Sequence, residues 1–203
     1  MAQRGAYAKG IAKREEILTT ALDVIVREGF SGASVRQLAD AVGLSQAGLL
    51  HYFASKDELF TEVLRKRDEV DAVGMDAAGP DPVALFDGFL ALIRHNADVP
   101  GLVQLYVHLS AAATDPAHDG HEYFRERVEQ IRSRFAPAIA DLQKRGDLPS
   151  SLEPEQLSRI LIALADGLQE QWLMDPSIDM AGDIAALLQA LGLGSSATAA
   201  PAR

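Results

Sequence analysis

Residues 34–56 read SVRQLADAVGLSQAGLLHYFASK, and this stretch carries the signals of two short helices with a tight corner between them. Ser34 precedes Gln37 by three residues, which is the spacing of a capping box at a helix start. Gly43 follows the first helix, and a glycine there can adopt the left-handed conformation that ends a helix. Ser45 is a preferred N-cap residue for a second helix. The pattern predicts a helix-turn-helix, whose second helix enters the DNA major groove.

The apolar residues of this stretch indicate which side of each helix faces inward. Leu38, Ala39 and Val42 recur at helical spacing on the first helix. Leu49 and Phe53 stand four residues apart on the second helix, so they point to the same side. An ordinary helical hairpin of an all-α protein has the same spacing, so spacing alone does not separate a DNA-binding motif from a structural hairpin. The residues left on the outer face are Ser45, Gln46, Gly48, His51 and Tyr52.

The particular residues favour the DNA-binding motif. The stretch contains, in order, Leu38-Ala39, Gly43-Leu44-Ser45, Leu49, Tyr52-Phe53 and Lys56. With these residues the chain resembles, over about residues 11–70, the DNA-binding domain of the TetR family of bacterial transcriptional repressors. Two positions depart from the family pattern. Ala47 stands where a glycine is common, and Leu50 stands where a tyrosine that touches a phosphate is common, and a leucine cannot donate a hydrogen bond.

The outer face and the resemblance together imply a set of DNA contacts. Gln46 and His51 are the best candidates for base contacts, because their side chains can donate and accept hydrogen bonds. Phosphate contacts are expected from Ser34, Arg36, Tyr52 and Lys56. The full predicted DNA-binding set is Ser34, Arg36, Ser45, Gln46, Ala47, Gly48, His51, Tyr52 and Lys56.

The charge distribution fits a DNA-binding N-terminal part, although the 203-residue chain has a formal net charge of −10. Residues 1–56 contain seven Lys and Arg against five Asp and Glu, whereas residues 57–203 contain twelve against twenty-four. Because the acidic remainder is repelled by phosphates, the basic end is expected to face the duplex. The basic residues in or beside the predicted motif include Arg4, Lys9, Lys13, Arg14, Arg36 and Lys56.

Composition limits the class of protein further. The chain has no cysteine, which excludes disulfides and thiolate metal sites and suits a reducing cytosol. The N-terminus MAQRGAYAKG lacks the apolar core of a signal peptide, and no run of about 18 apolar residues occurs. A cytoplasmic protein without a membrane span is therefore predicted.

The rest of the chain reads as helix throughout, without a strand pattern or a repeat. The predicted fold class is all-α, with about nine helices. The predicted domain plan is a flexible N-terminal arm (1–10), a DNA-binding domain (11–73), a linker (74–81), a helical effector-binding and dimerisation domain (82–192) and a disordered tail (193–203). The predicted helices span 11–29, 34–42, 45–52, 55–73, 82–96, 100–113, 121–145, 154–174 and 177–191.

The last two helices are predicted to form a homodimer. They carry more apolar residues than one monomer face needs, and Ala163 and Gly167 allow close helix approach. The last two helices of TetR relatives form a four-helix dimer interface, so the resemblance implies the same here, while burial in the chain's own core is the alternative. The predicted interface residues are Leu157, Ile160, Leu161, Leu164, Leu168, Trp172, Ile184, Leu187, Leu188 and Leu191.

The resemblance also implies that the helices of residues 82–145 enclose a small-molecule effector, which the sequence does not identify. Each candidate lining residue could equally be ordinary core. The candidates are Phe86, Phe89, Tyr106, His108, Tyr123, Phe124 and Phe135.

The sequence offers little support for a metal site or for catalysis. His118 and His121 stand three residues apart beside Asp115, Asp119 and Glu122, but two histidines without a fixed partner are a weak metal signal. No nucleophile–base pair with an orienting group and no glycine-rich phosphate loop is found. We therefore predict no metal, no cofactor and no enzymatic activity.

The leading interpretation is a ligand-responsive transcriptional repressor that binds an inverted-repeat DNA operator as a homodimer and is released by a small-molecule effector. An activator or an effector-independent DNA binder with the same fold is the first alternative. A small all-α enzyme and a pure interaction module are the remaining ones.

Overall fold

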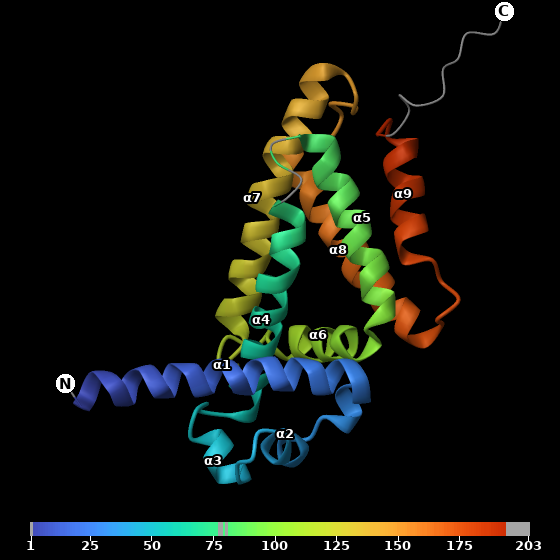
Figure 1. Ribbon diagram of the computed structural model, residues 1–203. Helices are drawn as coiled ribbons and strands as arrows, with labels where there is room; N and C mark the ends of the chain where they lie inside the picture. Colours follow the sequence, from blue (N-terminus) through green and yellow to red (C-terminus); the bar gives the residue numbers. More distant parts are fainter. Residues whose placement is uncertain (1, 77–78, 80, 194–203) are drawn as a thin grey trace, which may run out of the picture. The chain divides into compact units, whose positions relative to one another are not determined.

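The computed structural model describes residues 2–76, 79 and 81–193, and over these residues it contains nine α-helices, one short 3-10 helix and no strand (Figure 1). The predicted all-α fold class is confirmed. None of these helices is long and apolar enough to cross a membrane. The elements are α1 Ala2–Glu28, η1 Phe30–Gly32, α2 Val35–Ala41, α3 Gln46–Leu50, α4 Lys56–Asp76, α5 Pro82–Asp98, α6 Pro100–Ala112, α7 His121–Arg145, α8 Pro154–Met174 and α9 Met180–Ala190.

The chain divides into two compact units. The first unit takes the residues up to 72 together with 98–125, and the second takes 73–97 together with the residues from 126 on. The predicted C-terminal domain spans residues 82–192, whereas the structure groups α6 and the start of α7 with the N-terminal helices. The first unit therefore contains more than the DNA-binding motif.

The first unit is built around α1, which contacts both α2 and α6 (Figure 1). Gly101 permits the close approach of α6, because a Cβ atom at this position would lie 2.5 Å from the backbone oxygen of Ile25 and 2.8 Å from Cα of Gly29. Gly29 itself has a φ of 78° and ends α1, as predicted. Leu105 of α6 is completely buried in the same apolar cluster as Ile25.

The second unit contains most of α5 and α7 together with α8 and α9. Phe86 and Phe89 of α5 each meet the ring of Phe135 on α7 in edge-to-face contacts, with centroids 5.2 Å apart. Arg132 of α7 pairs with Glu155 of α8, with Nη1 and Oε2 2.9 Å apart. These contacts join α7 to α5 through apolar side chains and to α8 through charged ones.

Several helix ends differ from the predictions. α1 begins at Ala2 where a flexible arm is predicted for 1–10, since Ala, Gln, Arg and Lys are good helix formers that outweigh Gly5 and Gly10. α4 continues to Asp76, inside the predicted linker. The predicted tail begins at Leu193, which instead is buried and donates its N–H to the Leu188 carbonyl at 2.9 Å. Residues 194–203 lie outside the described part of the chain.

The start of α9 is also later than predicted. The expected first residue, Ser177, forms hydrogen bonds from its N–H and hydroxyl to the Asp175 carboxylate, at 3.0 and 2.7 Å. These hydrogen bonds lower the pKa of Asp175 below its ordinary value. Asp179 then caps the helix by accepting the N–H of Gly182 at 2.9 Å. A local turn thus competes with the first turn of the predicted helix.

Candidate DNA-binding surface

The capping box at the start of α2 is present as predicted. Ser34 Oγ accepts the N–H of Gln37 at 3.3 Å, and Gln37 Oε1 accepts the N–H of Ser34 at 3.0 Å. The two contacts satisfy backbone donors that have no partner within the helix. They fix the residue at which α2 begins and hold Ser34 at the surface.

The corner between α2 and α3 is built by backbone geometry. Gly43 has a φ of 68°, in the left-handed region, and Leu44 donates its N–H to the Ala39 carbonyl at 2.9 Å. Ser45 then caps α3 by accepting the N–H of Gly48 at 3.0 Å. From α1, Lys13 donates to the Val42 carbonyl at 3.1 Å, so the end of α2 is also held from outside the motif.

The side chains of α2 and α3 divide into an inner and an outer set. Leu38, Leu49 and Phe53 are no more than 2% exposed and belong to the core of the first unit, as predicted. Gly48 and Tyr52 of the predicted DNA-binding set are half-buried. The remaining members are exposed: Ser34, Arg36, Ser45, Gln46, Ala47, His51 and Lys56.

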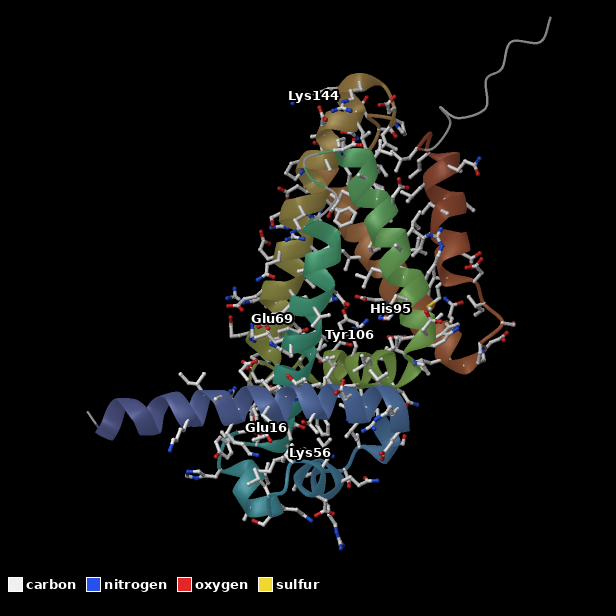
Figure 2. The ribbon with its side chains drawn as sticks, in the orientation of Figure 1. Glu16, Lys56, Glu69, His95, Tyr106 and Lys144 are labelled. Carbon is white, nitrogen blue, oxygen red and sulfur yellow. The ribbon has the colours of Figure 1, made fainter. Side chains whose placement is uncertain are left out.

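Arg36, Lys56 and His51 of this set make weak contacts within the chain, whereas Tyr52 packs against the apolar cluster of the first unit. The Arg36 side chain is 78% exposed, and its Nε lies 4.0 Å from Asp40. Lys56 lies at the start of α4 (Figure 2). Its Nζ is 5.5 Å from the centre of the Phe60 ring. The rings of His51 and Tyr52 are 6.0 Å apart. An exposed side chain with weak internal contacts is available to a ligand.

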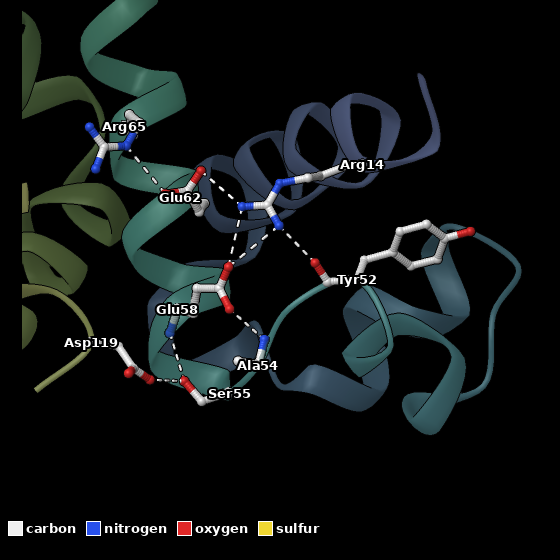
Figure 3. A network of polar contacts seen from close by, with 8 residues as sticks. All are labelled: Arg14, Tyr52, Ala54, Ser55, Glu58, Glu62, Arg65 and Asp119. Carbon is white, nitrogen blue, oxygen red and sulfur yellow. Dashed lines mark hydrogen bonds and ion pairs between the residues drawn. The ribbon is translucent and has the colours of Figure 1, made fainter. Parts of the chain in front are cut away.

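Arg14 of α1 holds the turn that follows α3 (Figure 3). Its Nη1 donates to the Tyr52 carbonyl at 2.7 Å, and its Nη2 pairs with Glu62 at 3.1 Å and with Glu58 at 3.4 Å. The guanidinium also lies over the Phe53 ring, 4.4 Å from its centre. From the sequence, Arg14 is predicted only as a basic residue near the motif, because its partners lie on other elements.

The start of α4 is tied to the loop before α7 within the first unit. Ser55 Oγ accepts the N–H of Glu58 at 2.9 Å, and the Ser55 hydroxyl donates to Asp119 (Figure 3). Glu58 also accepts the N–H of Ala54. The chain between α3 and α4 is thereby fixed at both ends, which limits how the outer face of α3 can move.

Of the other basic residues near the motif, Lys9 is exposed to solvent and Lys66 is paired with carboxylates. The side chain of Arg4 lies outside the described side chains. Lys66 of α4 bridges Glu15 of α1, at 2.9 Å, and Glu69, at 3.1 Å. The hydrogen bond to Glu15, and to a smaller extent the one to Glu69, raises the pKa of Lys66 above its ordinary value. Lys66 therefore links α1 to α4.

The predicted effector residues are distributed over both units. In the second unit, Phe86 and Phe135 are buried and Phe89 is half-buried. In the first unit, Tyr123 and Phe124 are buried with Tyr106 in the apolar cluster that also contains Leu49. His108 contacts the Phe30 ring, with centroids 5.5 Å apart. The structure brings the three phenylalanines together and groups the other four residues with the DNA-binding helices.

The predicted dimer residues also separate by exposure. Six are buried within the chain and have little surface left to lose on association: Leu157, Leu161, Leu168, Trp172, Ile184 and Leu188. Ile160 is 42% exposed, and Leu164, Leu187 and Leu191 are partly exposed. Ala163 is exposed and Gly167 is partly exposed on α8. Periodicity identifies the apolar positions but does not reveal which of them the chain itself covers.

The two histidines considered for a metal site contact protein groups. His118 Nδ1 accepts the N–H of Gly120 at 3.0 Å, and its Nε2 lies 3.6 Å from Asp57. His121 Nδ1 lies 2.9 Å from the carbonyl oxygen of Ala113, so this nitrogen is the donor. Both side chains serve to order the loop between α6 and α7.

The glycine corner, the N-capped α3, its buried inner face and its polar outer face together form a helix-turn-helix. Comparison with known protein families identifies the family to which the chain belongs. Residues 17–63 match the family described as bacterial regulatory proteins, tetR family, and residues 107–191 match the BetI-type transcriptional repressor C-terminal family. The chain belongs to the TetR family of transcriptional regulators.

Individual relatives agree with this assignment. The HTH-type transcriptional regulator RutR of Escherichia coli K12 is 33% identical over 98 residues, which cover 47% of this chain and 46% of RutR. This chain thus matches less than half the length of that relative. The HTH-type transcriptional repressor AcnR of Corynebacterium glutamicum is 28% identical over 76% of this chain and 78% of its own.

A solved structure shows the same fold. The TetR-family transcriptional regulator from Agrobacterium tumefaciens superposes with a TM-score of 0.72 at 17% sequence identity, over 90% of this chain and 99% of that one. At this identity the similarity concerns the fold alone. Together with the two family matches, it supports the helical arrangement of both units.

Proposed function

We propose that this TetR-family regulator is a repressor that binds an inverted-repeat operator as a homodimer and leaves it when a small-molecule effector binds. The observation that carries the proposal is the outer face of α3. Ser45, Gln46, Ala47 and His51 are exposed there, while Leu49 is completely buried. AcnR is named a repressor, and the matched C-terminal family is described as one of repressors.

The DNA contacts follow from the chemistry of the exposed groups. Gln46 and His51 can donate to and accept from base edges in the major groove. Arg36 and Lys56 supply the charge for phosphates, and the capped Ser34 supplies a hydroxyl. The chain has no acidic residue between Asp40 and Asp57, so no carboxylate on α3 repels the duplex.

Two copies are needed for tight binding, because one short helix reads only one half-site. The partly exposed apolar side chains of α8 and α9 are suited to joining two copies across a two-fold axis. The proposed contacts are Ile160 and Leu164 on α8 and Leu187 and Leu191 on α9, with Ala163 and Gly167 permitting close approach. A two-fold dimer implies an operator that is an inverted repeat.

The effector is proposed to bind beside the aromatic group of the second unit, formed by Phe86, Phe89 and Phe135. Aromatic side chains are a common lining of small-molecule sites. The effector would release the protein from DNA only if it binds more tightly to the conformation that does not fit the operator. A thermal-shift screen detects such a ligand, because binding to the native state raises the melting temperature.

The direct test is selection of bound sequences from a random DNA pool at near-physiological salt. An enriched inverted repeat supports the proposal. Gln46→Ala should lower the discrimination between the preferred base and the other bases at one operator position by about tenfold. Lys56→Ala should weaken binding to all sequences and lower the slope of log affinity against log salt by about 1.

The matched control for Lys56→Ala is Lys144→Ala, which removes the same charge from an exposed position on α7 in the second unit. We expect its affinity and salt slope to equal those of the unchanged protein. If the pool yields no enriched sequence with effector-free, refolded protein, then the motif is a structural hairpin and the proposal is wrong.

A further inference from the structure

One large apolar side chain, Leu50, stands on the outer face of α3. Leu50 is 37% exposed, whereas the neighbouring Leu49 is completely buried. Leu50 follows Gln46 by four residues and Ala47 by three, and side chains at these spacings lie on the same side of a helix. Gln46 and Ala47 are both exposed. Leu50 and Ala47 therefore form a small apolar patch between the polar side chains of Gln46 and His51.

Leu50 lies outside the buried apolar cluster of the first unit. The apolar cluster of the first unit takes Leu49 and Phe53 from this segment, and Leu44 and Tyr52 pack against its edge. Leu50 belongs to neither group. An apolar side chain at the centre of a surface gains free energy when a ligand covers it, in proportion to the apolar area removed from water.

The major groove offers one apolar group to such a side chain. Guanine, cytosine and adenine present only hydrogen-bond donors and acceptors there, whereas thymine adds its C5-methyl group. A leucine placed over the amino group of cytosine would leave that donor without a partner, which costs free energy. The patch is thus matched to thymine and opposed to cytosine at the same position.

We propose that Leu50, with Ala47 beside it, is a specificity-determining residue that contacts the C5-methyl group of one thymine in each operator half-site. The inference rests on the proposed DNA-binding function and deepens it by naming the base feature that is read. It assigns to Leu50 a role that the predicted set of polar contacts does not include.

The experiment uses the full chain and the operator found by selection. Each thymine of the operator is replaced in turn by deoxyuridine, which lacks only the methyl group. For the unchanged protein, one such replacement should lower the affinity by about fourfold per half-site, the value that corresponds to one buried methyl-sized group. For Leu50→Ala, the same replacement should have no effect.

Two further variants control the experiment. Leu50→Met keeps an apolar side chain of similar volume and should retain the sensitivity to deoxyuridine. Val70→Ala removes an exposed apolar side chain from α4 and should leave the affinity and the sensitivity unchanged. Binding of Leu50→Ala to non-operator DNA at low salt, at the strength of the unchanged protein, confirms that this variant folds.

The outcomes separate the inference from the function on which it depends. An enriched operator in which no deoxyuridine replacement lowers affinity overturns the role of Leu50 and leaves the DNA-binding proposal intact. An equal loss in Leu50→Ala and the unchanged protein assigns the methyl contact to another residue and also overturns it. Failure to enrich any sequence overturns the proposed function, and the inference with it.

Discussion

Arg14 stabilises the position of α3 without lying on its outer face. Its guanidinium binds the carbonyl oxygen of Tyr52, a residue in the turn that follows α3. It also pairs with two carboxylates of α4. Arg36 has the same charge, but its side chain is 78% exposed and its Nε lies 4.0 Å from the Asp40 carboxylate. The two arginines therefore serve different purposes, one inside the fold and one at the proposed phosphate contacts.

Replacing each arginine by glutamine separates these purposes. Arg14→Gln should lower the free energy of unfolding by about 1–3 kcal/mol, because a charged donor to a backbone carbonyl is lost. Arg36→Gln should change stability by less than about 0.5 kcal/mol and reduce the salt dependence of DNA binding. Urea unfolding and operator binding at several salt concentrations measure both effects. Equal stabilities for the two variants would contradict the role given to Arg14.

The start and end of a helix can be predicted from the sequence where the contacts that determine them are local. The box of Ser34 and Gln37, the corner at Gly43 and the cap at Ser45 each involve residues within a few positions of one another. The contact of Arg14 with Tyr52 joins residues 38 positions apart and depends on how helices pack. The same reason explains why the covered and uncovered residues of α8 and α9 could not be separated beforehand.

Gly43 gives a prediction for the corner between α2 and α3. Its φ of 68° is unfavourable for a residue with a Cβ atom, so Gly43→Ala should lower the free energy of unfolding by about 1 kcal/mol. Gly10→Ala is the matched control, since Gly10 lies inside α1 and an added Cβ would meet no described atom within 4 Å beyond the neighbouring residues and the nearby backbone of its own helix. This control should raise stability by about 0.5–1 kcal/mol.

Thermal or urea unfolding of the two variants provides the measurement. Opposite signs are expected, because the same added methyl group meets a strained backbone at one position and a helical backbone at the other. A Gly43→Ala variant as stable as the unchanged protein would show that the corner does not require a left-handed residue.

The distribution of charge over the chain limits how a dimer can bind DNA. The chain is strongly acidic outside residues 1–56, so most of its surface charge is repelled by phosphates. The attraction comes from few basic side chains, and one copy on one half-site is expected to bind weakly at physiological salt. Affinity for an operator should therefore depend on whether two copies are joined.

This dependence predicts the effect of a charge on α8. Ile160 is 42% exposed, so Ile160→Glu should fold but place a charge within the proposed dimer contact. We expect a monomer in sedimentation equilibrium and an operator affinity at least about a hundredfold lower, because the second half-site no longer adds to the first. Val128→Glu, at a 39% exposed position on α7, should remain dimeric with unchanged affinity. If the Ile160→Glu protein stays dimeric, the two copies associate through another surface. If it is a monomer with full operator affinity, DNA binding does not require two joined copies.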